Sequence, residues 1–143
     1  MTTASLERIH DSFELLAPKI AMMTATFYET LFEGRPAVRA LFKVNMDTQR
    51  QHLAAALALI VRNLGMMDAL QEPLRQLGRD HARVGARPEH YPLVRDAMLH
   101  AIAQAIGPAW TPELAADWRM LIEEISTAML AGTLPKRPGN REQ

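Results

Sequence analysis

The spacing of apolar residues is helical along almost the whole chain. Leu6, Ile9 and Phe13 recur every three or four residues, and the same interval continues as far as Met129. An interval near 3.6 puts apolar side chains on one side of a helix, whereas a half-buried strand alternates apolar and polar residues. The sequence has no clear alternation of this kind and no Asn-Gly or Asp-Gly pair that would indicate a hairpin. The pattern therefore predicts an all-α protein.

Proline, glycine and capping residues divide the chain into about seven expected helices. Their expected ranges are 5–17, 18–34, 36–42, 47–64, 68–84, 88–106 and 111–132. Asp47 and the Asp68–Gln71 pair are expected N-terminal caps, and Thr111 followed by Pro112 is a strong start signal. The unequal lengths and the brief 36–42 segment argue against a symmetric four-helix bundle.

The chain is long enough for one domain with a sizeable core. It has 143 residues, with no internal repeat and no change of composition that would mark a domain boundary. We expect one domain over residues 1–132. The polar, proline-containing segment 133–143 is expected to be a disordered tail.

Charge and composition argue against several classes of partner. Sixteen basic residues balance sixteen acidic ones, which gives no reason to propose nucleic acid or an anionic membrane. There is no cysteine, so disulfides, thiolate metal ligands and a cysteine nucleophile are excluded. Charged residues begin at Glu7, before any apolar run that could be a secretory signal or a membrane span. We therefore expect a cytoplasmic protein without a membrane span.

One histidine stands in a row of apolar residues. The row at helical spacing is Leu70, Leu74, Leu77, His81 and Val84. An imidazole on an apolar helix face needs a partner for its nitrogens, which a hydrogen bond or a metal ion can supply. Gly78, one turn earlier, suggests that something packs close to this helix. His81 is therefore a candidate metal ligand, with a hydrogen-bonded core histidine as the alternative.

The other residues do not build a metal site from protein ligands alone. No helix carries the HExxH or ExxH spacing of zinc and di-iron sites, and no nucleophile elbow indicates a serine hydrolase. Asp80 is next to His81 in sequence and so points off its face. A metal with one protein ligand takes its other ligands from a prosthetic group, and haem is the common case.

Five segments together resemble the globin family. They are "TFYETLF" (26–32), "PAVRALF" (36–42), "TQRQHLAAALALIV" (48–61), "LGRDHARVGARPEHYPLV" (77–94) and "AADW" (115–118). The resemblance covers residues 5–131 and is closest to single-domain bacterial haemoglobins related to the haem domain of flavohaemoglobins. It implies the globin fold, in which helices cross steeply around a pocket for haem b.

The resemblance also implies a role for particular residues on the two sides of the haem. His81 is the proximal iron ligand, with Tyr91 near it and Leu77 and Val94 lining the pocket. The second ring nitrogen of His81 is expected to donate to a backbone carbonyl one turn earlier. On the distal side, the expected residues are Tyr28 and Gln49 as the polar pair, Phe42 on the haem face and Leu53 in the wall.

The sequence departs from the family pattern at two proximal positions. Asp80 stands where a basic residue often precedes the proximal histidine, so the haem propionates need other partners, for which the candidates are Arg50, Arg79, Arg83 and His52. Thr133 stands where the family's glutamate pairs with the tyrosine, here Tyr91. Without that carboxylate, we expect the His81 imidazole to carry less negative charge.

These features predict a five-coordinate haem globin that reversibly binds dioxygen, nitric oxide and carbon monoxide. Its role is expected to be oxygen binding or storage, or nitric oxide detoxification. Whether it is an enzyme is left open, because the given sequence ends after the globin and nitric oxide dioxygenation would need an external reductase.

Other interpretations also stay open. A six-coordinate redox or gas-sensing globin would use His52 as a second iron ligand, and a haem-free interaction module would keep His81 without a ligand role. The oligomeric state is open as well, with a homodimer compatible with the sequence.

Overall fold

The computed structural model describes residues 1–135, in which there are helices and no strands. The α-helices are α1 (Thr3–Leu16), α2 (Ile20–Gly34), α3 (Met46–Arg62), α4 (Met67–Arg83), α5 (His90–Ile106) and α6 (Pro112–Thr133). Four short 3-10 helices connect them: η1 (Ala17–Lys19), η2 (Pro36–Leu41), η3 (Leu64–Met66) and η4 (Gly107–Ala109). The all-α prediction is confirmed. The helix expected at residues 36–42 is present as the 3-10 helix η2. Its six residues connect α2 to α3 and take the tighter 3-10 winding, which is typical of short connectors. Most of the expected tail, residues 136–143, lies outside the described residues.

The helix starts confirm one expected cap and correct two. Thr111 accepts a hydrogen bond from the backbone N–H of Leu114 at 3.1 Å, as its Thr-Pro signal predicted. The cap of α3 is Asn45, whose side chain accepts from the N–H groups of Asp47 and Thr48, so the Asp47 cap was wrong. Asp47 already lies in the first turn, where its carboxylate faces the positive end of the helix dipole.

The starts of α4 and α5 also differ from the sequence prediction. α4 begins at Met67 directly after η3 and has no side-chain cap, so the Asp68–Gln71 capping box was wrong. The preceding 3-10 turn already orders the chain there. α5 begins at His90, after a turn in which the His90 Nδ1 accepts from the backbone N–H of Arg87 at 3.0 Å.

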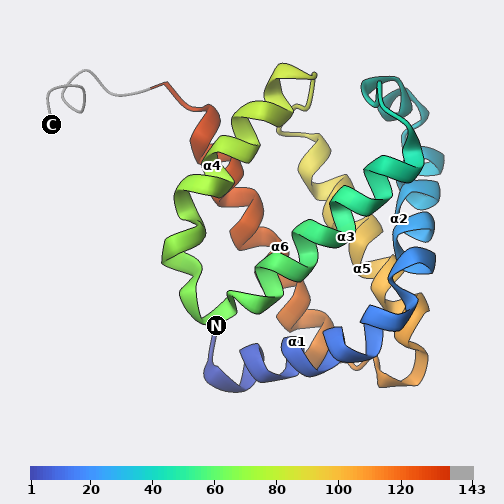
Figure 1. The fold of residues 1–143 in the computed structure, drawn as a ribbon, viewed down its shortest axis with the longest axis vertical. Helices are drawn as coiled ribbons and strands as arrows, with labels where there is room; N and C mark the ends of the chain where they lie inside the picture. The colour runs from blue at the N-terminus through green and yellow to red at the C-terminus, as the bar shows by residue number, and fades with distance from the viewer. Residues whose placement is uncertain (136–143) are drawn as a thin grey trace, which may run out of the picture.

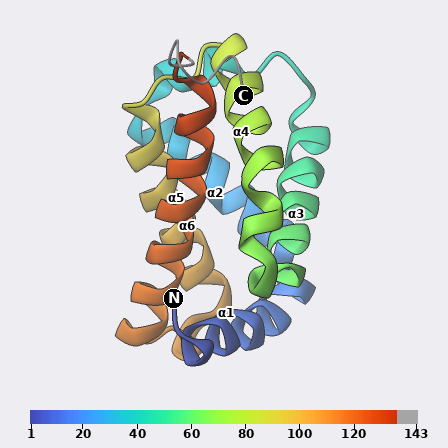
Figure 2. The ribbon, with the colours of Figure 1, turned by 90° about the vertical axis from the view of Figure 1, so that its left-hand side faces the viewer.

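The helices cross one another rather than running as a parallel bundle. Figures 1 and 2 show α4 beside α6, α2 beside α5, and α1 lying across one end of the molecule. The pairs α4–α6 and α2–α5 make the most extensive contacts, whereas α3 and α4 pack little on each other in the described chain. α3 and α4 are therefore supported separately, by α2 and α6 respectively.

Two glycines let α4 and α6 approach very closely. A Cβ atom at Gly78 would lie 1.9 Å from the backbone oxygen of Met129, and one at Gly132 would lie 2.1 Å from that of Arg75. Only a residue without a side chain fits at either point. The close neighbour that Gly78 suggested is therefore the backbone of α6, one turn before His81.

The main core holds α1 and α6 together with α2 and α5. Trp118 is fully buried, and its indole Nε1–H donates to the Ser12 hydroxyl at 2.9 Å. Beside it the buried Asp117 accepts two hydrogen bonds from Arg8, at 2.6 and 3.1 Å. A second, small cluster of Leu74, Ala128 and Met129 lies between α4 and α6.

No single helix of the described chain is long and apolar enough to cross a membrane. The segments Met46–Arg62 and Leu64–Arg83 meet that test only when taken together across a bend of 72°.

Candidate functional site

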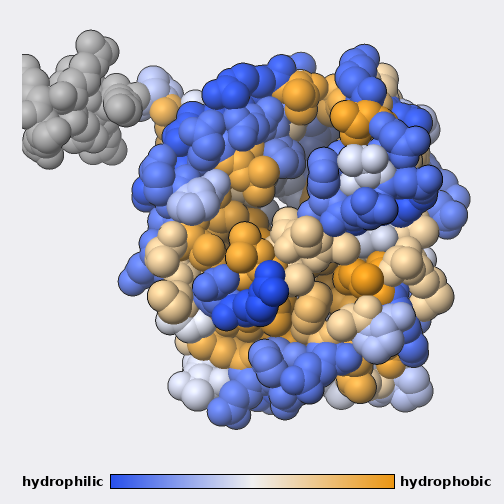
Figure 3. Space-filling view, in the orientation of Figure 1, coloured by the Kyte–Doolittle hydropathy of each residue, from blue (hydrophilic) through white to orange (hydrophobic). Residues whose placement is uncertain are grey.

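The expected site lies where α3 and α4 stay apart. Figure 3 shows a hollow in the molecular surface between the beginning of α3 and the end of α4. The expected distal residues belong to α2, η2 and α3, and the expected proximal residues belong to α4 and α5. The fold therefore separates the two groups onto different helices.

The ring of His81 is held by its own helix. Its Nδ1 lies 2.8 Å from the backbone oxygen of Leu77, one turn earlier, which confirms the carbonyl partner that the sequence predicted. Because a carbonyl can only accept, Nδ1 carries a hydrogen, and in the neutral ring the lone pair then lies on Nε2. His81 is exposed, so this lone pair is available to a ligand.

The apolar row of α4 leaves the core before it ends. Leu74 is buried, Leu77 is half-buried and Val84 is 62% exposed, so the expectation that Val84 continues a core-facing row was wrong. The reason is that Val84 follows the last residue of α4, and Gly85 with a φ of 106° turns the chain away.

The three other residues expected on the proximal side pack against two different clusters. Leu77 and Tyr91 pack against the small α4–α6 cluster, whereas Val94 packs against the main core. Tyr91 is half-buried, and this burial raises the pKa of its hydroxyl.

The two residues expected to form the distal polar pair are joined by a hydrogen bond. The Gln49 amide Nε2 donates to the Tyr28 hydroxyl oxygen at 3.1 Å. Tyr28 is only 5% exposed, and burial raises its pKa more than the bond from Gln49 lowers it. The hydroxyl therefore stays protonated at neutral pH. Its own hydrogen has no acceptor in the described part of the chain, because Tyr28 is the acceptor in its one hydrogen bond there.

Aromatic rings surround this pair. The Phe42 ring meets the Tyr28 ring edge-on, with centroids 5.5 Å apart at 81°. Phe32, which the sequence analysis did not single out as a site residue, lies 5.8 Å from Tyr28 and 5.4 Å from Phe42. The four-residue interval between Tyr28 and Phe32 was the available signal. Leu53, one turn after Gln49 on α3, is half-buried against the main core.

The candidate propionate partners already take part in surface interactions or are exposed. Arg79 pairs with Glu72 at 2.8 Å, Arg83 pairs with Asp80 at 2.7 Å, and Arg50 pairs with Asp47. His52 is exposed on α3. Exposed ion pairs contribute little free energy, so these arginines can exchange partners readily.

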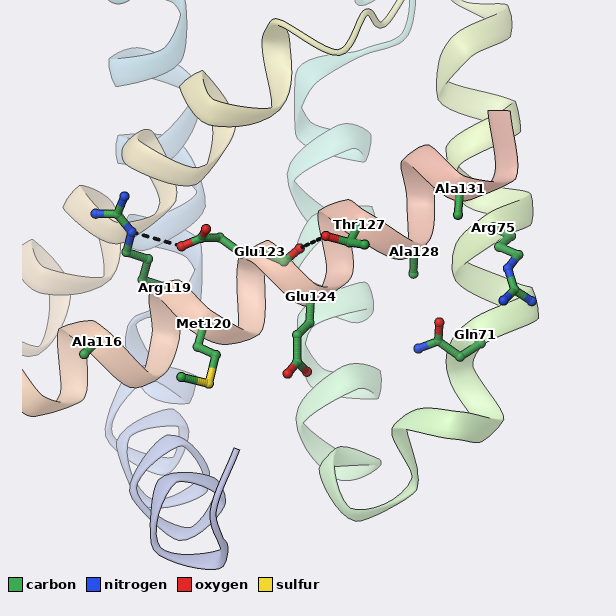
Figure 4. A pocket seen from close by; sticks show the side chains of 10 residues that line it. All are labelled: Gln71, Arg75, Ala116, Arg119, Met120, Glu123, Glu124, Thr127, Ala128 and Ala131. Atoms are coloured by element: carbon green, nitrogen blue, oxygen red, sulfur yellow. Dashed lines mark hydrogen bonds and ion pairs between the residues drawn. The ribbon is translucent and has the colours of Figure 1, made fainter. Parts of the chain in front are cut away.

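A separate hollow of about 720 Å³ lies between α4 and α6 (Figure 4). Its lining includes Gln71 and Arg75 from α4, and Met120 with the Arg119–Glu123 ion pair from α6. It contains none of the predicted site residues and is open to solvent, so we regard it as a surface groove.

The donor set of the chain is poor in metal ligands. Within residues 1–135, no group of three or more histidine and acidic side chains is arranged to hold a metal ion. His81 would therefore contribute a single bond to a metal whose other ligands come from a prosthetic group.

Comparison with known proteins identifies the family. The globin family profile matches residues 25–129, so the chain belongs to the globin family. It is 28% identical over 129 residues to a flavohemoprotein of Bacillus subtilis, covering 88% of this chain and 32% of that protein. It is 26% identical to an uncharacterized globin-like protein of Aquifex aeolicus, with 96% of both chains covered.

A solved structure shows the same fold. It is the engineered carbene transferase RmaNOD, made from a candidate nitric oxide dioxygenase of Rhodothermus marinus. The TM-score is 0.81 at 29% identity, with 90% of each chain covered. The chain spans about a third of the length of the Bacillus flavohemoprotein, so that whole protein's activity does not transfer with the similarity. The predicted globin fold is confirmed, and membership of the globin family implies haem binding.

Proposed function

We propose that this chain is a haem b globin that binds dioxygen, nitric oxide and carbon monoxide, with His81 as the only protein ligand to iron. When bound, haem would supply an iron centre that can bind a small gas. The observation that carries the proposal is the hydrogen bond from His81 Nδ1–H to the Leu77 carbonyl, because it leaves the lone pair of Nε2 for the iron.

The residues around His81 and around the Tyr28–Gln49 pair fit haem, which is a flat apolar ring with a metal ion at its centre. Leu53, Leu77, Phe42 and Val94 are all half-buried and can cover apolar surface. The partner of His81 is a neutral carbonyl rather than a carboxylate. Thr133, which stands at the position of the family's glutamate, donates to the backbone oxygen of Leu130 at 2.7 Å. We therefore infer a neutral proximal imidazole rather than one with imidazolate character.

Tyr28 supplies the main hydrogen-bond donor to the gas. Its hydroxyl oxygen accepts from Gln49, so its hydrogen is free to point toward a partly negative ligand. Gln49 fixes this orientation, and its amide nitrogen has a second hydrogen to donate. A hydrogen bond worth about 1.4 kcal/mol would slow gas release roughly ten-fold.

The favoured activity is nitric oxide dioxygenation, in which NO, O₂ and one electron give nitrate. The similarity to flavohemoproteins and to the Rhodothermus structure supports it, together with the Tyr28–Gln49 donor pair. The partner would be an external reductase. The test mixes the protein with dioxygen and nitric oxide, with and without a flavin reductase and its reductant. Sustained nitrate formation is expected, whereas a single stoichiometric burst would make the protein an oxygen binder.

The His81 assignment is tested with His81→Gly. We expect the haem absorbance band to be lost or strongly shifted, and to return when free imidazole fills the space left by the side chain. The matched control is His100→Gly, which introduces the same helix-interior glycine on α5 at an exposed histidine. The assignment is wrong if His81→Gly retains the original spectrum and haem affinity.

The alternative with His52 as a sixth ligand has its own signature. We expect the ferrous protein without added gas to show one broad visible band, which indicates an open coordination position. Sharp, split bands that disappear in His52→Ala would establish the six-coordinate form instead.

A further inference from the structure

We propose that Arg39 is a positioning residue of the distal site, one that holds Phe32 and Phe42 in place and through them the Tyr28 hydroxyl. The inference rests on the proposed role of Tyr28 as donor to the gas. Arg39 lies outside the haem-contacting residues expected from the sequence.

Arg39 is attached to the distal wall at two points. Its Nη1 donates to the backbone oxygen of Phe42 at 3.2 Å, and its Cζ lies 5.6 Å from the centroid of the Phe32 ring. Phe42 directly follows the last residue of η2, where the chain turns toward α3. A carbonyl at a helix end has no partner within the helix, so the guanidinium stabilises this turn as well as the Phe32 ring face.

Both rings held by Arg39 border Tyr28, as does the ring of Phe27 on α2. Phe32 and Phe42 contact each other at 66°, and both contact the Tyr28 ring. Edge-on ring contacts are directional, so a shift of Phe42 changes the space available to Tyr28. At the inner end of this chain of contacts, the Tyr28 oxygen accepts from Gln49.

Arginine suits this position better than lysine. Its planar guanidinium can lie near a ring face and donate from its edge at the same time, whereas an ammonium group is a compact point charge. Arg39 is itself exposed, so shortening its side chain removes little buried surface. We therefore expect Arg39 variants to fold and to bind haem.

The experiment uses carbon monoxide as the probe and the infrared C–O stretching band as the readout. In the parent protein we expect one dominant band, lowered in frequency by donation from Tyr28, and Tyr28→Phe should raise it. Arg39→Ala should add a second band near the Tyr28→Phe position and release dioxygen about five-fold faster, the effect expected from partial loss of one hydrogen bond. Arg39→Lys should restore part of the original band.

The matched control is Arg35→Ala, an exposed arginine at the start of the same segment. Its backbone N–H donates to Leu31 and its backbone oxygen accepts from Val38, and the substitution leaves both bonds in place. It should keep the parent band. The band reports only folded, haem-loaded molecules, so a loss of stability cannot imitate the effect. If Arg39→Ala and Arg39→Lys keep the single parent band while Tyr28→Phe shifts it, the positioning role is overturned and the donor role of Tyr28 stands. If Tyr28→Phe leaves the band in place, the donor role itself fails.

Discussion

The apolar row of α4 is interrupted at one side chain, His81. Leu74 packs into the cluster with α6, whereas His81, two turns later, lies beyond that contact and is exposed. Its partner, the Leu77 carbonyl, belongs to the same helix, so ring orientation is decided locally. Position along the helix thus explains why a row that begins in the core with Leu74 reaches an exposed imidazole at His81.

At the same scale, both residues proposed for the distal side should affect gas release. We expect Tyr28→Phe to speed dioxygen dissociation about ten-fold in stopped-flow measurements, since the direct donor is lost. Gln49→Leu should have a smaller or similar effect, because Tyr28 keeps its hydroxyl but loses the bond that orients it. Unchanged dissociation rates in both variants would show that the distal assignment is wrong.

At the scale of whole helices, the α4–α6 crossing is the contact that determines where His81 stands. Gly78 and Gly132 bring each backbone against the other, and the crossing lies one turn from His81. Packing at such a distance leaves no room for the helices to slide independently. The helix that carries His81 is therefore positioned by α6, although α6 contributes none of the predicted iron or gas contacts.

This crossing predicts a clear difference between two glycine substitutions. Gly78→Ala should lower the free energy of unfolding by about 3 kcal/mol, because its methyl group would meet backbone that cannot rotate away. Gly34→Ala, at the open end of α2 with nothing within 4 Å, should raise it by about 0.5 kcal/mol. Urea unfolding of the two variants measures both. Equal stabilities would mean that the close approach does not constrain the fold.

At the scale of the whole molecule, α6 also ties the N-terminal helix to the rest. Two neighbouring residues on α6 form hydrogen bonds with α1. Asp117 accepts from Arg8, and Trp118 donates to Ser12. These bonds join segments more than a hundred residues apart in the sequence. α6 thus contacts both α4, which carries His81, and α1, which crosses one end of the molecule (Figure 1).

The Arg8–Asp117 pair predicts a pH dependence of stability. The hydrogen bond from Arg8 holds the Asp117 pKa below its ordinary value of 3.8. A lowered pKa in the folded state means that the stabilisation is complete above the unfolded pKa and is lost as the pH falls through the folded one. The parent protein should therefore exceed Asp117→Asn in urea midpoint at pH 7, and the gap should close below about pH 4.

The control for this measurement is Asp11→Asn, which removes an exposed carboxylate from α1. It should change the midpoint little at any pH. If the difference in urea midpoint between the parent protein and Asp117→Asn stayed constant from pH 7 to the acid range, the proposed link between stability and the Asp117 pKa would be wrong.

What could be read from the amino-acid sequence was local. The helical interval and the Thr111 cap each depend on residues within about one turn, so spacing alone predicts them. The His81–Leu77 bond is equally local, but it was expected from the iron-ligand role that the family resemblance implies for His81. The family resemblance added the pairing of Tyr28 with Gln49, which no spacing rule provides for residues so far apart in the chain. The Asn45 cap and the exposed Val84 were missed, because helix ends depend on where the neighbouring chain turns.

Only the tertiary structure decided which helices touch. The contact of Gly78 with the backbone of Met129, the inclusion of Phe32 among the distal rings and the position of Arg39 over that ring all depend on how separate segments pack. Helix periodicity is a short-range property of the backbone, whereas crossing geometry depends on side-chain shapes on two helices at once. The sequence therefore determined the helices and the iron-binding candidate, and packing decided which helices contact one another and which side chains surround the candidate site.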